Sequence, residues 1–423
     1  MKITDTNTNQ TSVTMKASQT HLSLKKIIIW IALQLFFVIG LQAAWIEKLP
    51  TVVKDPDGME LKIFSTGDEY FSFLHDENDY TIIQGNDGYY YYAIQQGENI
   101  IASNYRVRNT NPFLTNIQAG VRISSEEYKS RRDAFWKDAP ENTSKSVHEG
   151  TMVNLVVYIR FADDTEYVLP RSTYDARFNG SDQQSIKDYF QEVSYNNLTI
   201  QSYHYPESEM SVNISYQDQY TRDYYRPYNE TTNPIGYQGG NSGSQRIDRE
   251  HTLLQNAVNA ISSAIPSNLV IDANNDGKVD NVCFIIRGNA EGWADLLWAH
   301  RWVLYSKTVN INGKRVYDYT FQPENQTTVK TLAHEMFHTL GAPDLYHYSY
   351  DGLNPAGDWD LMQSGFGHMG AYMKWKYAGQ KWVTSIPVIS APGTYTLNPI
   401  SSSSQNAFRI NSPNSSTEYF VVE

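Results

Sequence analysis

The stretch from Thr328 to Leu340 constrains the fold more than any other part of the chain, because it has the period of a helix with two different faces. Residues four apart lie one above the other on a helix, so His334 and His338 present their imidazoles on one side. Glu335 is one residue round from His334. The pattern predicts a helix with a histidine pair on one face and a core face on another. The core face consists of Val329, Leu332, Ala333, Met336, Phe337 and Leu340.

The residues after this helix are suited to complete a metal site. Gly341 can adopt a positive φ just past the helix, which lets the chain fold back sharply. Pro343 stiffens the return, and Asp344 then arrives within reach of the histidines. Three protein ligands with one open position are typical of a catalytic zinc site. We therefore expect zinc on His334, His338 and Asp344.

Glu335 lies beside this metal site rather than on it. A carboxylate in that place can take a proton from water activated by zinc, so Glu335 is the predicted general base. The alternative interpretation is a solvated polar face on an amphipathic helix. A His-Glu-x-x-His pattern arises by chance in about one chain in a hundred of this composition, and the added glycine and aspartate lower that chance further.

The third ligand has competitors. One class of such enzymes takes a glutamate from a later helix, but the glutamates after Asp344 are Glu418 and Glu423, both in a β-like segment. His347 and His368 are the other candidates. We favour Asp344, with the two histidines as polar residues that have other partners or face the substrate.

The motif continues into Asp360-Leu361-Met362-Gln363-Ser364-Gly365. With this continuation the sequence resembles the immune-inhibitor-A-like family of secreted bacterial zinc metallopeptidases, over roughly residues 150–385. The resemblance implies a metzincin-like architecture in which Met362 lies on a tight turn beneath the metal. Family members often carry a tyrosine after that turn that assists catalysis. The nearest here is Tyr372, and its role stays open.

Strand, helix and turn patterns together with this resemblance predict an α+β fold. A mixed, twisted sheet with the active-site helix is expected over residues 150–386, preceded by a β-rich, propeptide-like unit at 45–122. The polar stretch 123–149 suits an exposed linker or a loosely packed helix. Residues 387–423 are typical of the start of a C-terminal β-region that is cut short at the end of this sequence.

Residues 1–44 have the order of a secretory signal peptide. Lys25 and Lys26 precede an apolar run at 27–41, and Ala43 and Ala44 follow it. That run is shorter than the ~20 residues that span a bilayer, which favours cleavage over a retained anchor. We expect a secreted protein, extracellular or at the cell surface, without a membrane span after cleavage.

Before processing, the enzyme must be kept inactive by a group other than a cysteine thiolate. The single cysteine, Cys283, lies in an apolar run and is expected to be buried. Since the propeptide-like unit has none, a carboxylate such as Asp68 or Glu69, or steric cover, would keep the site silent. Cleavage near Arg131-Arg132 would then release the unit.

A second metal site is one of two interpretations of residues 272–280. Asp272, Asn274, Asp276 and Asp280 place oxygen ligands around Gly277, as in the first part of a calcium-binding loop. The bidentate glutamate that closes such a loop is replaced by cysteine. The other interpretation, a plain turn before a strand, is the favoured one.

The composition of the chain limits the classes of partner that it can bind. The formal net charge of -12 argues against nucleic acid, because a basic surface is needed to offset phosphate repulsion. We expect a monomer that acts on protein or peptide substrates as a zinc-dependent endopeptidase. The alternatives are a catalytically silent binding protein on the same fold and a zinc hydrolase of a non-peptide substrate.

Overall fold

The computed structural model describes residues 46–137, 147–181, 185–240, 243–289, 296–346, 353, 355–363, 365 and 367–423. The signal peptide expected at residues 1–44 lies outside the described residues and stays a prediction. Among the described residues, no helix is both long enough and apolar enough to cross a membrane.

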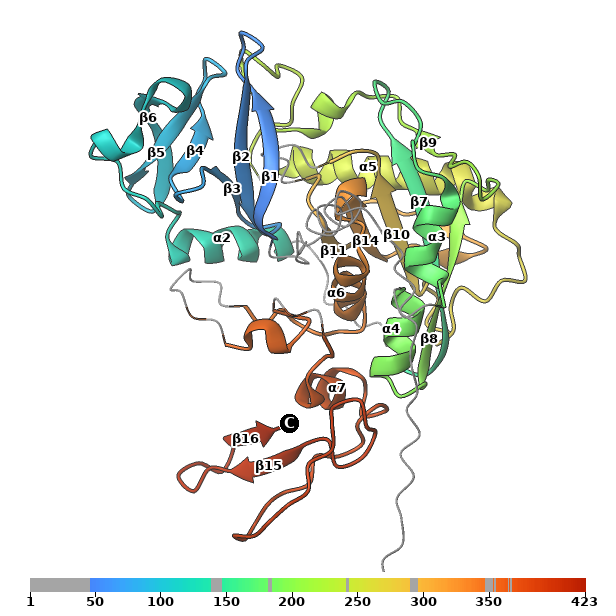
Figure 1. Cartoon of the computed structure of the whole chain (residues 1–423). Coiled ribbons are helices and arrows are strands. Elements are labelled where there is room, and N and C mark those ends of the chain that lie inside the picture. The colour runs from blue at the N-terminus through green and yellow to red at the C-terminus, as the bar shows by residue number, and fades with distance from the viewer. Residues whose placement is uncertain are drawn as a thin grey trace, which may run out of the picture. The chain divides into compact units, whose positions relative to one another are not determined.

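The amino-terminal unit is a six-stranded antiparallel sheet in which each strand pairs with the next (Figure 1). Its first turn depends on Gly58, which has a φ of 82° and donates its N–H to the carbonyl of Asp55 at 2.8 Å. The six strands of this sheet agree with the β-rich character expected for residues 45–122. The strands are β1 (Ile46–Lys54), β2 (Glu60–Gly67), β3 (Ser72–His75), β4 (Thr81–Gln84), β5 (Tyr90–Gln96) and β6 (Asn99–Arg106).

Part of the stretch expected to be a linker is a helix held against this unit. Helix α2 covers Ser125–Trp136 and is capped by the side chain of Ser124. Tyr128 on α2 is 1% exposed, and its hydroxyl donates a hydrogen bond to the carboxylate of Asp68. Of the two interpretations of residues 123–149, an exposed linker or a loosely packed helix, Ser125–Trp136 has the helix, and a buried contact with a distant residue orders it.

The second sheet is mixed, as predicted. Its strand order is β11-β14-β10-β7-β8, with β9 also pairing with β7. All neighbours run parallel except β11, which is antiparallel to β14 at the edge. Every residue of β10 is buried, as expected for a parallel strand covered on both faces. The strands are β7 (Gly150–Arg160), β8 (Leu198–Tyr205), β9 (Tyr216–Gln217), β10 (Asn281–Ile286), β11 (His300–Val303) and β14 (Asp318–Pro323).

Helices cover both faces of this sheet (Figure 1). Leu155 and Val157 of β7 share a core with α5, whereas Val156 and Tyr158 share a core with the other helices. This alternation follows from the two-residue period of a strand. The helices are α5 (Ser244–Ile261) on one face and α3 (Arg171–Asn179), α4 (Ile186–Val193) and α6 (Val329–Thr339) on the other.

One core joins the two sheets. Tyr70 and Phe71 of the amino-terminal unit and Tyr128 of α2 belong to the same buried cluster as Phe284 of β10 and Trp302 of β11. The amino-terminal unit is therefore packed on the second sheet rather than tethered to it. This contact determines what lies near α6.

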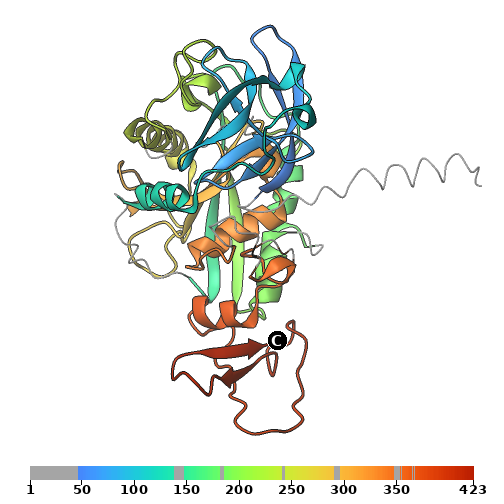
Figure 2. The same cartoon turned by 90° about the vertical axis from the view of Figure 1, so that its left-hand side faces the viewer.

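After α6 the described chain forms one more helix and a strand pair (Figure 2). The hairpin β15–β16 is the β-structure found in the region 387–423, where a β-region was expected. The remaining elements are α7 (Ala371–Tyr377), β15 (Phe408–Asn411), β16 (Tyr419–Val422) and the short pair β12 (Asn310–Ile311) and β13 (Lys314–Arg315).

The Tyr128–Asp68 contact yields a stability prediction. Tyr128→Phe removes the hydroxyl but keeps the ring, which leaves a buried carboxylate short of a donor and should lower the free energy of unfolding by ~1–3 kcal/mol. Urea unfolding is measured at pH 8, because burial raises the pKa of Asp68 to about 7 and the group is then ionised. Tyr105→Phe, at a side chain 38% exposed, is the control. Equal midpoints for the two variants would contradict the structural role of this bond.

Candidate metal centre

Helix α6 holds the histidine pair as the sequence predicts. The Thr328 side chain caps it by accepting a hydrogen bond from the N–H of Thr331 at 3.2 Å. Leu332, Met336 and Phe337 are buried in the core shared with β7 and β10. This packing fixes the rotation of α6 about its own axis. The burial of the apolar face therefore determines the direction in which the histidines point.

The turn after α6 brings the third side chain back to the helix. Gly341 has a φ of 102°, and its N–H donates to the carbonyl of His338 at 2.9 Å. Ala342 donates to the carbonyl of Phe337 at 3.1 Å. These bonds satisfy carbonyls at the helix end and turn the chain, as is common at helix C-termini. The carboxylate of Asp344 is thereby placed opposite the histidines.

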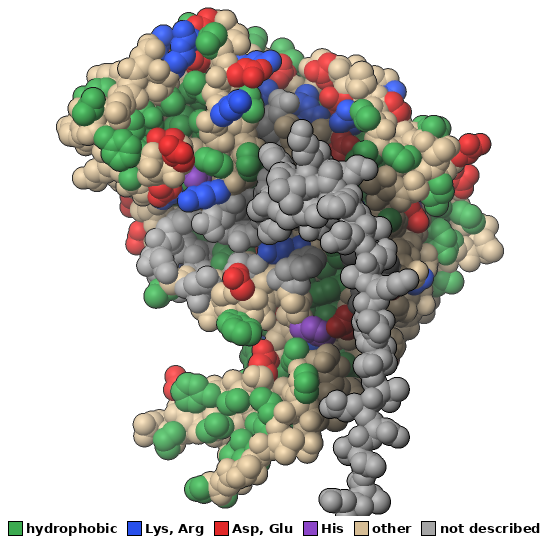
Figure 3. All heavy atoms as spheres, viewed as in Figure 1, with side chains coloured by type: hydrophobic (Ala, Val, Ile, Leu, Met, Phe, Trp, Pro, Cys, Tyr) green, Lys and Arg blue, Asp and Glu red, His purple; other side chains and the backbone are tan. Residues whose placement is uncertain are grey.

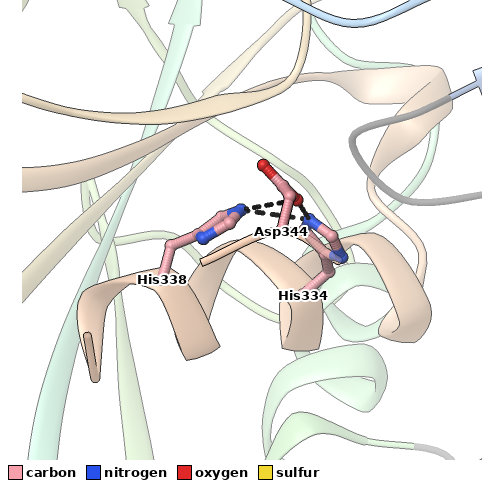
Figure 4. Close-up of side chains that lie close together, drawn as sticks. All are labelled: His334, His338 and Asp344. Atoms are coloured by element: carbon pink, nitrogen blue, oxygen red, sulfur yellow. Dashed lines mark hydrogen bonds and ion pairs between the residues drawn. The ribbon is translucent and has the colours of Figure 1, made fainter. Parts of the chain in front are cut away.

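The side chains of His334, His338 and Asp344 converge on one point (Figure 4). Asp344 Oδ1 lies 3.0 Å from His334 Nε2 and 3.3 Å from His338 Nε2. The two Nε2 atoms are 3.1 Å apart. One ligand atom from each residue lies within 4.8 Å of the others, and among the described residues no second such cluster occurs. Two imidazoles and a carboxylate form a donor set that suits zinc.

Backbone carbonyls orient both imidazoles. Nδ1 of His334 lies 3.0 Å from the carbonyl oxygen of Leu361, and Nδ1 of His338 lies 2.7 Å from that of Ala342. A carbonyl only accepts, so each Nδ1 carries the hydrogen. The Nε2 lone pairs are then directed at the cluster, which is the arrangement expected of histidines that bind a metal.

The charges of the centre favour each other. Burial alone would raise the pKa of Asp344, but His338 and His334 hold it well below its usual value. Burial lowers the pKa of His338, but Asp344 outweighs it and raises that pKa to about 9. A divalent cation bound by the three side chains would favour neutral imidazoles and an ionised carboxylate.

Glu335 lies on the same helix beside the cluster, where the sequence places the base. It is 1% exposed, and its Oε1 has no hydrogen-bond partner among the described residues. Burial raises the pKa of Glu335, while the two histidines partly oppose that shift. A buried carboxylate with a free oxygen next to three metal-binding side chains is suited to accept a proton.

The turn that carries Met362 is closed by a residue to which the sequence alone gave no role. Asp360 accepts hydrogen bonds from the N–H of Met362 at 2.8 Å and of Gly370 at 2.7 Å. The Met362 carbonyl accepts from the N–H of Leu345 at 2.8 Å. Met362 is fully buried in the core of α6. The position of an aspartate two residues before the methionine could have indicated this role. Aspartate side chains often close turns by accepting a hydrogen bond from the backbone two residues further on.

The rival ligands do not join the cluster where they are described. His368 lies 2.9 Å from Glu192 and 3.2 Å from the ammonium of Lys374. The ring of Tyr372 lies against those of Trp375 and Tyr419. His347 lies outside the described residues. Of the candidates that the structure describes, Asp344 alone meets the histidine pair.

The loop considered for calcium has other partners. Asp272 accepts the N–H of Asp276 at 2.9 Å and of Gly277 at 3.0 Å, and it pairs with the ammonium of Lys314 at 2.6 Å. Asp280 accepts the N–H of Ala273 at 3.0 Å. These bonds are those of a turn, and the ammonium of Lys314 pairs with one of its carboxylates. The arrangement favours the turn interpretation.

Comparisons with known proteins agree with the site. Residues 273–374 match the model of the catalytic domain of immune inhibitor A, peptidase M6. Immune inhibitor A of Bacillus thuringiensis subsp. alesti is 33% identical over 108 residues, which cover 21% of this chain and 16% of the relative. The pre-pro-metalloprotease PrtV of Vibrio cholerae serotype O1 is 28% identical over 214 residues, 43% of this chain and 22% of the relative.

The matched stretches thus span about a fifth of the length of these relatives. Among solved structures, metalloproteinase-II of Bacteroides fragilis aligns over 78% of this chain and 84% of its own, with 10% identity and a TM-score of 0.28. The family model covers α6, the histidine pair, Asp344 and the Met362 turn, so this part of the chain is similar to the catalytic domain of the immune inhibitor A peptidases of family M6.

Proposed function

We propose that this protein is a secreted zinc-dependent endopeptidase that cleaves peptide bonds in proteins. The observation that carries the proposal is the convergence of His334, His338 and Asp344 beside the buried Glu335, whose Oε1 has no hydrogen-bond partner among the described residues. A structural zinc site would use all its positions for protein ligands. Three ligands next to a free, buried carboxylate suit a site that activates water.

The residues divide the chemistry between them. His334, His338 and Asp344 would hold zinc, which supplies Lewis acidity to a scissile carbonyl and lowers the pKa of water. Glu335 accepts the proton of that water and later passes it to the leaving amine nitrogen. Burial favours this second step, because the raised pKa of Glu335 makes its protonated form accessible. Met362 packs in the core of α6 and so supports the helix that carries the histidines.

An extended peptide has a place beside this centre. Strand β11 is the antiparallel edge of the sheet and pairs only with β14 among the described strands. Strand β11 contacts α6, the helix that carries Glu335, so the strand lies near the base. A substrate strand aligned with a sheet edge is held by its backbone on both sides of the cleaved bond, as an endopeptidase requires. The face in Figure 3 mixes acidic and basic side chains, and no preference for substrate charge follows from it.

Latency is part of the proposal. The amino-terminal unit packs in the same core as β11, next to the centre. The relative named a pre-pro-metalloprotease carries such a segment by its name, and we extend this to residues 45–122. The cut expected near Arg131-Arg132 falls within α2, where Arg131 pairs with Glu127 at 2.9 Å. Because proteases cleave extended segments, α2 has to open for a cut there.

Two other functions are separated from this one by a single assay. A catalytically silent binding protein would show no casein hydrolysis with or without a chelator. A zinc hydrolase of non-peptide bonds would show none either, but it would turn over ester or amide substrates in a chelator-sensitive manner. Chelator-sensitive casein cleavage supports the peptidase.

The role of the base is tested by Glu335→Gln. The variant keeps the shape of the side chain but cannot accept a proton, so peptide cleavage should fall by about 10²–10⁴-fold while bound zinc stays unchanged. Glu209→Gln, an exposed substitution, is the control. Zinc retained together with wild-type activity would remove Glu335 from the mechanism.

The ligand set is tested by metal content. Asp344→Ala leaves two imidazoles, so zinc affinity measured by chelator competition should fall by about 100-fold or more. His368→Ala should bind zinc as the wild type does, because His368 pairs with Glu192 instead. The reverse pattern would make His368 the third ligand.

Latency is tested by comparing the unprocessed chain with a chain that begins near Val147. The shorter chain should cleave one fluorogenic peptide at least ~10-fold faster, because the unit that covers the centre is gone. Equal specific activities would show that the unit assists folding or binding rather than inhibiting.

A further inference from the structure

Strand β11 is joined to helix α5 by two ionisable side chains that water does not reach. Glu250 of α5 is 0% exposed, and His300, the first residue of β11, is 1% exposed. Nε2 of His300 lies 2.9 Å from Oε1 of Glu250. Ionisable side chains are seldom buried in this way unless they are paired, because taking a charge out of water is costly. The pair is therefore a specific feature of this strand.

The hydrogen-bond partners define the charge of this pair. Nδ1 of His300 lies 2.8 Å from the carbonyl oxygen of Trp298, which can only accept. Tyr319 donates its hydroxyl to Oε1 of Glu250 at 2.5 Å, so that oxygen accepts as well. Burial acts to raise the pKa of Glu250, but His300 outweighs burial and lowers that pKa to about 2. Each ring nitrogen thus faces an acceptor, and a charged imidazole donates to an ionised carboxylate, which is among the stronger kinds of hydrogen bond.

The pair lies on the face of the sheet that α5 covers, whereas the helix of the metal centre covers the other face (Figure 1). Side chains alternate along a strand, so His300 points the same way as Trp302, which belongs to the core shared with α5. The ring of His300 also stacks on that of Phe321 in β14, with 5.2 Å between centroids. Strand β11 itself contacts α6. The strand therefore lies between its anchor on α5 and the helix that carries the metal-binding histidines.

Further bonds from α5 hold the chain just beyond β11. Nδ1 of His251 lies 2.6 Å from the hydroxyl of Ser306, and the amide of Gln255 donates to the carbonyl of Thr308 at 3.0 Å. The bond between Glu250 and His300 is the one that reaches β11 itself. Helix α5 thus fastens the strand at its first residue and the chain that follows it, which suits an edge strand whose position has to be exact.

We infer that Glu250 and His300 are positioning residues for the substrate: the bond between them holds the edge strand β11 where an extended peptide aligned with it reaches the metal centre. This inference rests on the proposed function, because it takes β11 as the strand with which the substrate pairs. Both side chains lie on the α5 face, so they act through the backbone of β11. An edge strand offers its N–H and C=O groups to an added strand, and a shift of β11 displaces all of these groups together.

The first test separates substrate binding from chemistry. Glu250→Met keeps a side chain of similar length but leaves His300 and Tyr319 without their acceptor. In enzyme processed from the full chain, KM for a peptide that extends to both sides of the cleaved bond should rise by about 10-fold or more, while kcat and zinc affinity stay within about 3-fold. The control is Asp248→Asn on the same helix, whose 66% exposed carboxylate pairs with Lys307 at 2.6 Å, and it should leave KM unchanged.

Two further variants keep this test decisive. In Glu250→Gln the amide can donate to Nε2 of a neutral His300 and its oxygen can still accept from Tyr319, so the anchor is retained and KM should stay within about 3-fold of the wild type. If Glu250→Met does not fold, judged by circular dichroism, the double variant Glu250→Met/His300→Phe takes its place. It exchanges the pair for apolar side chains, leaves no unpaired charge in the core, and should raise KM as Glu250→Met does.

The second test observes the strand without any assay of activity. Amide hydrogen exchange in residues 300–303, measured by mass spectrometry, should be at least ~10-fold faster in Glu250→Met than in the wild type, because the strand loses its anchor. Asp248→Asn should exchange these amides at the wild-type rate.

The outcomes separate this inference from the proposed function. An unchanged KM, or unchanged exchange in β11, in a folded variant without the bond overturns the positioning role, and so does a Glu250→Gln enzyme as impaired as Glu250→Met. In each of these cases a wild type that binds zinc and cleaves peptide leaves the proposed function standing. A wild type that neither binds zinc nor cleaves peptide overturns the proposed function, and the positioning role with it.

Discussion

Hydrogen bonds from two imidazoles to two backbone carbonyls determine the chemistry of this protein. His334 donates through Nδ1 to Leu361, and His338 donates through Nδ1 to Ala342. Each bond leaves Nε2 as the atom that can bind a metal. Both carbonyls belong to chain that follows α6, so the return of the chain at Gly341 orients the histidines and delivers Asp344 in the same step.

The charges at the centre follow from that geometry. Glu335 is 1% exposed and the side chain of Asp344 is 4% exposed, so both carboxylates lie largely out of water. The histidines lower the pKa of Asp344 against the effect of burial. A divalent cation would balance the negative charge of the two carboxylates, as the catalytic proposal requires.

The sequence was sufficient for the centre itself because the centre is local. His334, Glu335, His338, Gly341 and Asp344 lie within one helix and its turn, where residue spacing defines geometry. The mixed sheet and the β-rich amino-terminal unit were also predictable from alternation and apolar runs.

The features that the sequence could not predict depend on contacts between residues that are far apart in the chain. Helix α2 is ordered by Tyr128, which meets Asp68 from 60 positions away, so a polar stretch became a packed helix. The carboxylate of Asp272 pairs with Lys314, 42 positions further on, a partner that no loop pattern contains. The same limit applies to Asp68 and Glu69, which are alike as sequence: Asp68 accepts the hydroxyl of Tyr128, whereas Oε2 of Glu69 has no hydrogen-bond partner among the described residues.

The most direct test of the account is to locate the metal. Crystals of the full chain grown with zinc would be measured on both sides of the zinc absorption edge. The account predicts one anomalous peak at about 2.0–2.3 Å from His334 Nε2, His338 Nε2 and a carboxylate oxygen of Asp344. A peak elsewhere, for example at Asp272, or no peak between these three side chains, would contradict it.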